Sequence, residues 1–289
     1  MDGGTAPGRP LTGDVAGLFG PGSAAWQFQR EAFLLLGAGP RALLLQLAHP
    51  AVAAGVADHS DFRADPWRRL SGTLRSYLRI VFGTRAAARD EIRRLHRLHR
   101  TVTGPGYEAR DPTLALWVHA TLVDSTLAVN AAWDGPLGRW QAERFYAESL
   151  PLGRAFGIPD AALPPDLAAF ERYMADQIGP GGPVVVGATA RELAEAVLHP
   201  PLPGALGRLP LDRRLHGWLL WPAVGLLPAR VRAAYGLPWG PLERAVAAWL
   251  VAGWRAWNAR LPAGWRAMPQ ALAAERRLAD RPASTPVGQ

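Results

Sequence analysis

The feature that most constrains the fold is an apolar segment of twenty residues, 114–133, near the middle of the chain. Its large apolar side chains are not confined to one helical face, so a helix here must be covered on all sides. Its length alone would suit a membrane span. However, His119, Asp124 and Asn130 interrupt it, and such side chains are costly in hydrocarbon. We therefore expect a helix buried at the centre of a bundle.

The rest of the chain consists of segments with helical periodicity, separated by stretches rich in proline and glycine. Helices are expected over residues 23–36, 40–55, 67–82, 91–102, 141–156, 165–178, 190–198, 241–258 and 269–278. Residues 179–187, with three consecutive valines, favour an extended segment or strand. The sequence thus predicts an all-α fold, globin-like in general character. One helical bundle domain spans residues 23–280, between a flexible leader (1–22) and a disordered tail (281–289).

One motif in the first helices imitates a dinucleotide-binding loop. Gly37, Gly39 and Ala42 fit the pattern G-x-G-x-x-A. Asp58 follows about twenty residues later, where such a loop has the acidic residue that binds the ribose. That loop needs a strand before it and strand–helix alternation after it. Neither is present, so we reject a nucleotide-binding fold.

Composition excludes several classes of site. The chain has no cysteine, which rules out disulfides, zinc–thiolate sites, thiolate-ligated haem and cysteine nucleophiles. It has no lysine either, and its formal net charge of +8 rests on arginine. We see no basic strip interleaved with aromatic residues and no nucleic-acid-binding module, so we expect no nucleic-acid partner. The N-terminus lacks a basic start followed by an apolar core, which predicts a cytoplasmic protein.

A histidine lies on the apolar stripe of the segment 91–102. Ile92, Leu95, His99 and Val102 recur at helical spacing, whereas His96 falls on the flank of the stripe. An imidazole that points inward needs a hydrogen-bond partner, a metal ion or a cofactor iron. Spacing does not choose among these, and a core histidine satisfied by a backbone carbonyl is the simplest alternative.

Three other groups of polar residues are candidates for a site. Asp58, His59 and Asp61 could ligate a divalent metal ion or simply cap and turn the chain. The polar stripe Arg69–Thr73–Ser76 is either a solvated helix face or one wall of a buried site. His119 and Asp124 are five residues apart, so they point to different sides of their helix. No serine-hydrolase, phosphate-loop or zinc-protease motif is present.

Several blocks of sequence resemble a known family. They read Leu-Leu-Gln-Leu-Ala-His-Pro at 44–50, Gly-Val-Ala-Asp-His-Ser at 55–60, Arg-Leu-x-x-Thr at 69–73, Leu-His-x-x-Val-x-Gly at 98–104, Asp-Pro at 111–112, Trp-Val-His-Ala-Thr-Leu-Val-Asp-Ser at 117–125, Gly-Ile-Pro at 157–159, Leu-Leu-Pro at 226–228 and Tyr-Gly-Leu-Pro at 235–238. Together they resemble the oxygenases named after MpaB, an enzyme of the mycophenolic-acid pathway, and the rubber oxygenases, or latex clearing proteins.

The resemblance implies an all-α domain that binds haem b and uses dioxygen as a co-substrate. By its His-x-x-Val-x-Gly context, His99 takes the role of the proximal iron ligand, while Arg69 and Thr73 fall on the distal or haem-edge side. His119 and Asp124 are candidates to lie around the cofactor. Rubber oxygenases carry a lysine just before the threonine, where this chain has Gly72, so their lysine chemistry is not expected here.

Three functions are therefore open. The first is a haem-dependent oxygenase that acts on a small or medium apolar, unsaturated substrate inside the cell, with a redox partner. The second is a haem carrier or sensor without turnover, in which His59 or His119 fills the distal site. The third is a cofactor-free protein that binds lipid or a membrane surface through the Trp-rich segment 241–258 and the apolar segment 218–227.

Overall fold

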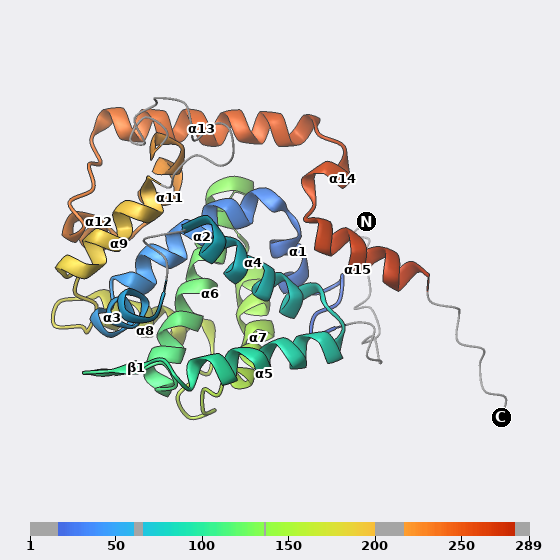
Figure 1. The fold of residues 1–289 in the computed structure, drawn as a ribbon. Coiled ribbons are helices and arrows are strands. Elements are labelled where there is room, and N and C mark those ends of the chain that lie inside the picture. Colours follow the sequence, from blue (N-terminus) through green and yellow to red (C-terminus); the bar gives the residue numbers. More distant parts are fainter. Residues whose placement is uncertain (1–16, 61–65, 136, 200–216, 281–289) are drawn as a thin grey trace.

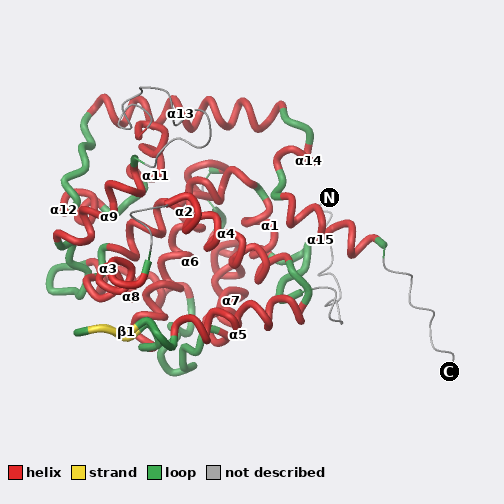
Figure 2. Tube along the Cα trace, viewed as in Figure 1, coloured by secondary structure: helices red, strands yellow, loops and turns green. Residues whose placement is uncertain are grey.

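The computed structural model describes residues 17–60, 66–135, 137–199 and 217–280. Within these ranges the chain is almost entirely helical, and the sheet it contains is a two-stranded hairpin (Figure 1; Figure 2). This confirms the predicted all-α class. Residues 1–16, 61–65, 136, 200–216 and 281–289 lie outside the described residues, and with them most of the predicted leader and the predicted tail.

The helices of the N-terminal half are α1 (Ala24–Arg30), α2 (Ala32–Leu47), α3 (Pro50–His59), α4 (Pro66–Phe82), α5 (Arg85–His99) and α6 (Pro112–Asp134). Between α5 and α6 the strands β1 (Thr103–Gly104) and β2 (Tyr107–Glu108) pair antiparallel, with Thr103 opposite Glu108. The C-terminal half contains α7 (Arg139–Ala155), α8 (Leu167–Ile178), α9 (Ala188–Leu198), the 3-10 helix η3 (Trp218–Leu220), α11 (Trp221–Gly225), α12 (Ala229–Ala234), α13 (Pro241–Arg260), α14 (Ala263–Arg266) and α15 (Pro269–Ala279).

Helix α6 lies in the middle of the other helices, as the apolar segment predicted (Figure 1). It packs against α2 and α7, and Trp117, Ala120, Val123 and Val129 are buried along it. Residues Pro112–Trp133 have the length and hydropathy of a membrane span, but 56% of their most apolar window is buried inside the protein. Burial of that size identifies α6 as the core helix of the bundle.

The predicted helix break at residues 37–40 was wrong. Helix α2 continues from Ala32 to Leu47 with Pro40 inside it, and the breaks fall at Glu31, whose backbone is extended, and at His49. A helical proline normally disturbs the turn before it, yet here tertiary packing holds that turn against α6. A Cβ added at Gly37 would lie 3.2 Å from a methyl group of Val129, so glycine permits this close approach.

Other boundaries differ in smaller ways. Helix α5 begins at Arg85, earlier than predicted, and ends at His99, before Val102. The Gly-Pro-Gly loop at 104–106 is the turn of the hairpin β1–β2, which the sequence did not predict. Residues 184–187 belong to no helix or strand, with Val184 and Val186 buried and Val185 exposed. They pair with no strand in the described part of the chain.

Candidate functional site

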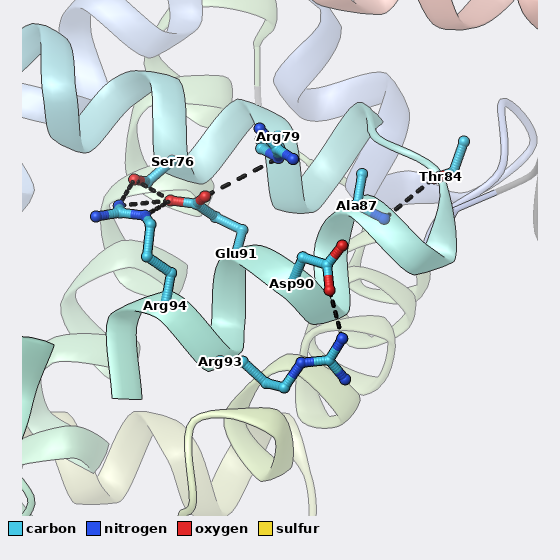
Figure 3. A network of polar contacts seen from close by, with 8 residues as sticks. All are labelled: Ser76, Arg79, Thr84, Ala87, Asp90, Glu91, Arg93 and Arg94. Atoms are coloured by element: carbon cyan, nitrogen blue, oxygen red, sulfur yellow. Dashed lines mark hydrogen bonds and ion pairs between the residues drawn. The ribbon is translucent and has the colours of Figure 1, made fainter. Parts of the chain in front are cut away.

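The two segments singled out for chemistry lie on consecutive helices, α4 and α5, joined by a short turn. Thr84 caps α5, its hydroxyl accepting a hydrogen bond from the backbone N–H of Ala87 at 3.1 Å (Figure 3). The chain reverses at this turn, so the N-terminal end of α4 and the C-terminal end of α5 lie at the open end of a helical hairpin (Figure 1). Arg69 and Thr73 belong to the first of these ends, and His99 to the second.

A buried carboxylate joins the two helices (Figure 3). Glu91 on α5 accepts hydrogen bonds from Ser76 Oγ on α4 at 2.6 Å and from Arg94 Nη2 at 2.6 Å. Arg94 Nη2 also donates to Ser76 Oγ at 2.8 Å, which closes a triangle. The hydrogen bond from Arg94 holds the pKa of Glu91 below its usual range, opposed by desolvation. Ser76, expected on a solvated or site-facing stripe, instead contributes to packing between the helices.

His99 is the last residue of α5, and its side chain is half-buried. Along the predicted stripe Ile92 is buried and Leu95 and Val102 are half-buried, while His96 is exposed. The stripe is therefore real, but His99 lies at its rim and not in the core position that the periodicity suggested. The reason is that the helix ends here: Val102 donates its backbone N–H to the His99 carbonyl oxygen at 3.3 Å as the chain turns into the hairpin.

The two candidate site residues on α4 are Arg69 and Thr73. Arg69 lies in the first turns of α4, but its side chain is outside the described part of the structure. Thr73, one turn later, is exposed. Between them Gly72 faces open space, because a Cβ built there meets no heavy atom within 4 Å.

In the connector that was a candidate for metal binding, Asp58 and His59 make hydrogen bonds to other parts of the chain. Asp58 accepts a hydrogen bond from Tyr107 Oη at 2.7 Å, and this bond is the main cause that raises the pKa of Tyr107 to about 12. His59 Nε2 donates to the Thr103 carbonyl oxygen at 3.0 Å. Both side chains thus fasten α3 to the hairpin β1–β2, and Asp61 lies outside the described residues. Among the residues that the structure describes, no three His, Asp or Glu side chains are arranged to hold a metal ion.

His119 on α6 is buried, with 4% of its surface exposed, and neither ring nitrogen has a hydrogen-bond partner. It lines a cavity of about 10 Å³, roughly the space that one water molecule needs, together with Gln29, Tyr77 and Ser149. Burial lowers the pKa of His119 to about 4, so the imidazole is neutral. The cavity is far too small to hold the haem that the family resemblance implies.

Asp124 points to another side of α6, as its spacing from His119 predicted. Its carboxylate pairs with Arg41 of α2 at 2.7 Å. The Arg41 side chain is 4% exposed and also donates to Ser125 Oγ at 2.8 Å and to the Leu226 carbonyl oxygen at 2.9 Å. Arg41 and Asp124 form the polar side of an open cavity of about 410 Å³, whose other lining residues are Met174, Ala175, Ile178, Gly179, Pro228, Ala229 and Arg230.

Sequence reasoning missed Arg41. It lies directly after Pro40 in a run of leucines, where nothing local distinguishes a buried guanidinium from an exposed one. The structure therefore separates the five predicted site residues into three places: the open end of the α4–α5 hairpin, the His119 cavity and the Arg41–Asp124 pair. Neither cavity has His99 or Thr73 among its lining residues.

Comparisons with known proteins agree with the resemblance seen in the sequence. Residues 26–257 match the family described as ER-bound oxygenase mpaB/B'/rubber oxygenase, catalytic domain. An uncharacterised protein of Mycobacterium tuberculosis and one of Mycobacterium bovis are each 28% identical to the chain over 232 residues, which cover 76% of this chain and 87% of the relative. No solved structure gives a significant match.

Proposed function

The chain belongs to the family of MpaB and rubber oxygenases, and from this premise we propose that it is a haem b-dependent oxygenase with His99 as the iron ligand. Its substrate in this proposal is a small or medium apolar, unsaturated molecule. The observation that carries the assignment is the position of His99 in the chain, at the C-terminal end of α5 and so at the same open end of the hairpin as the Arg69–Thr73 turn of α4.

The donor set of the chain fits a histidine-ligated haem. With no cysteine present, an iron ligand must come from His, Tyr, Met or a carboxylate. His99 is half-buried, whereas His96 on the same helix is exposed. His119 is enclosed in a cavity of about 10 Å³, which leaves no space for haem. His99 is therefore the better choice among these histidines.

When bound, haem supplies the iron centre at which dioxygen reacts. The residues of the chain then hold and shield that centre. Arg69 carries a permanent charge in a planar fork, which suits a haem propionate or a polar oxygen species. Thr73, one turn further on the same helix, offers a hydroxyl donor toward the same region. Since the chain has no lysine and Gly72 precedes Thr73, proton transfer in this proposal does not use a distal lysine.

The remaining assignments belong to the same proposal. We place the protein in the cytoplasm, with a redox partner that supplies electrons and without a nucleic-acid partner. In this proposal His119 and Asp124 do not contact the iron: His119 is a neutral polar group in a small cavity inside the bundle, and Asp124 holds Arg41. Their role is to support the fold around the site.

Dioxygen uptake by the full chain, prepared with haem, tests the proposal. A panel of unsaturated fatty acids, terpenoids and longer isoprenoids is offered, and dissolved oxygen is followed. We expect uptake above background with at least one class, reduced to background in His99→Ala and retained in His96→Ala, because His96 is exposed on the same helix. Background uptake with every class, in a protein that carries haem, would contradict oxygenase activity and favour a haem carrier.

A further inference from the structure

Helix α13 lies along one edge of the molecule, with α14 continuing from its C-terminal end (Figure 1). Its inner side packs against α11 and η3, and Ala247 and Leu250 are buried there. Its outer side carries large apolar residues that remain exposed. Leu242 and Trp249 are each 67% exposed, Trp257 is 62% exposed, and Trp265 on α14 is 78% exposed.

The three residues on α13 form one face of that helix, and Trp265 lies on the short helix α14 that follows. Trp249 and Trp257 follow Leu242 after seven and fifteen residues, which places all three on the same side of a helix. The positions between them on that side are small and also exposed, namely Ala245, Ala252, Gly253 and Ala256. We call Leu242, Trp249, Trp257 and Trp265 the tryptophan face. Exposed indoles of this number are costly in water unless something covers them.

Along the chain, the charged residues of the segment 244–274 have one sign. Residues 244–274 contain four arginines and no aspartate or glutamate. Arg244, Arg255 and Arg260 are exposed. The acidic residue at the start of α13, Glu243, is occupied as a cap, since its carboxylate accepts a hydrogen bond from the Gly240 N–H at 2.7 Å. The surface therefore offers tryptophan rings for an interface and positive charge for an anionic partner.

We propose that the tryptophan face docks on the surface of a bilayer that contains anionic lipid. Indoles prefer the headgroup level, where the ring is sheltered and the N–H is hydrated. An amphipathic helix with tryptophan on one side and arginine beside it lies in that interface plane. The isolated rings separated by alanine and glycine fit a fluid surface better than the close-packed centre of a protein interface. This inference goes beyond the oxygenase proposal and does not depend on haem.

Vesicle sedimentation with the full chain tests the inference. Vesicles of phosphatidylcholine alone are compared with vesicles that also contain phosphatidylserine. We expect the protein to pellet with the anionic vesicles, less so at high salt. The triple variant Trp249→Ala, Trp257→Ala, Trp265→Ala should bind about tenfold or more weakly, since each indole buries apolar surface in the interface. Its thermal unfolding should stay close to that of the wild type.

A matched control comes from another exposed tryptophan. Trp140 on α7 is 66% exposed and lies under the guanidinium of Arg144, away from α13 in the sequence. Trp140→Ala should bind vesicles as the wild type does. Equal loss in this control, or no binding of the wild type to either vesicle, would overturn the inference. A wild type that ignores vesicles but dimerises in analytical ultracentrifugation through the same tryptophans would assign the face to a second copy instead.

Discussion

At the scale of single residues, His99 and His119 differ in burial, although the sequence led to the same expectation for both. Both were expected to point inward. His119 is enclosed without a partner and is held neutral by burial, whereas His99 is half-buried at a helix end. An imidazole without a partner in the core resists protonation, and this resistance couples the stability of the fold to pH.

The sign of this coupling is definite. The pKa of His119 is lowered from 6.5 to about 4 in the folded protein. Above pH 6.5 the imidazole is neutral in both the folded and the unfolded protein, so His119 does not change the free energy of unfolding. As the pH falls from 6.5 towards 4, the unfolded protein binds a proton at His119 and the folded protein does not. The free energy of unfolding therefore falls by about 1.4 kcal/mol per pH unit, about 3 kcal/mol in all. Urea unfolding across this range should show the loss in the wild type and in His96→Ala, and a flatter profile in His119→Leu. Parallel profiles for all three proteins would refute the assignment.

At the scale of elements, the helices α4 and α5 are joined by the carboxylate of Glu91. In the sequence this residue lies outside the apolar stripe of α5, so its burial was not expected. Glu91 is buried and bonded to both Ser76 and Arg94, so it joins the helices that carry the candidate site. Asp90, its neighbour, forms an ion pair with Arg93 on the exposed side of the same helix. Figure 3 shows the two carboxylates pointing in different directions.

This contrast predicts unequal effects of two similar substitutions. Glu91→Ala should lower the free energy of unfolding by about 1–2 kcal/mol, because Ser76 and Arg94 lose a charged hydrogen-bond acceptor. Asp90→Ala should change it by less than about 0.5 kcal/mol, as expected of an exposed pair. Chemical denaturation of both variants at neutral pH checks the difference. Similar losses in the two variants would show that the buried network contributes nothing beyond a surface ion pair.

Sequence patterns predicted the elements better than their ends. The apolar segment around α6 and the helices α4, α7, α8 and α13 follow from periodicity, since one apolar face or a fully apolar run leaves few alternatives. The continuity of α2 through Pro40 could not be predicted, because packing of Gly37 against Val129 decides it. The ion pair of Arg41 with Asp124 joins residues 83 positions apart, and no local pattern reports such a contact.

At the scale of the whole molecule, the helices place two features apart from each other. The hairpin α4–α5 holds the candidate iron ligand, and the edge helix α13 carries the tryptophan face (Figure 1). The motif blocks that identify the family also give the residue identities of the candidate site, but they give neither the rim position of His99 nor the cavity around His119. Those depend on where helices end and on which side chains meet across the core.

The most direct test of the account is an absorption spectrum of the protein expressed with a haem precursor. Wild type, His99→Ala and His96→Ala are compared after their helical content is matched by circular dichroism. We predict a Soret band in the wild type and in His96→Ala, and its loss or marked shift in His99→Ala. A well-folded wild type without a Soret band, or a His99→Ala variant with an unchanged one, would contradict haem ligation by His99.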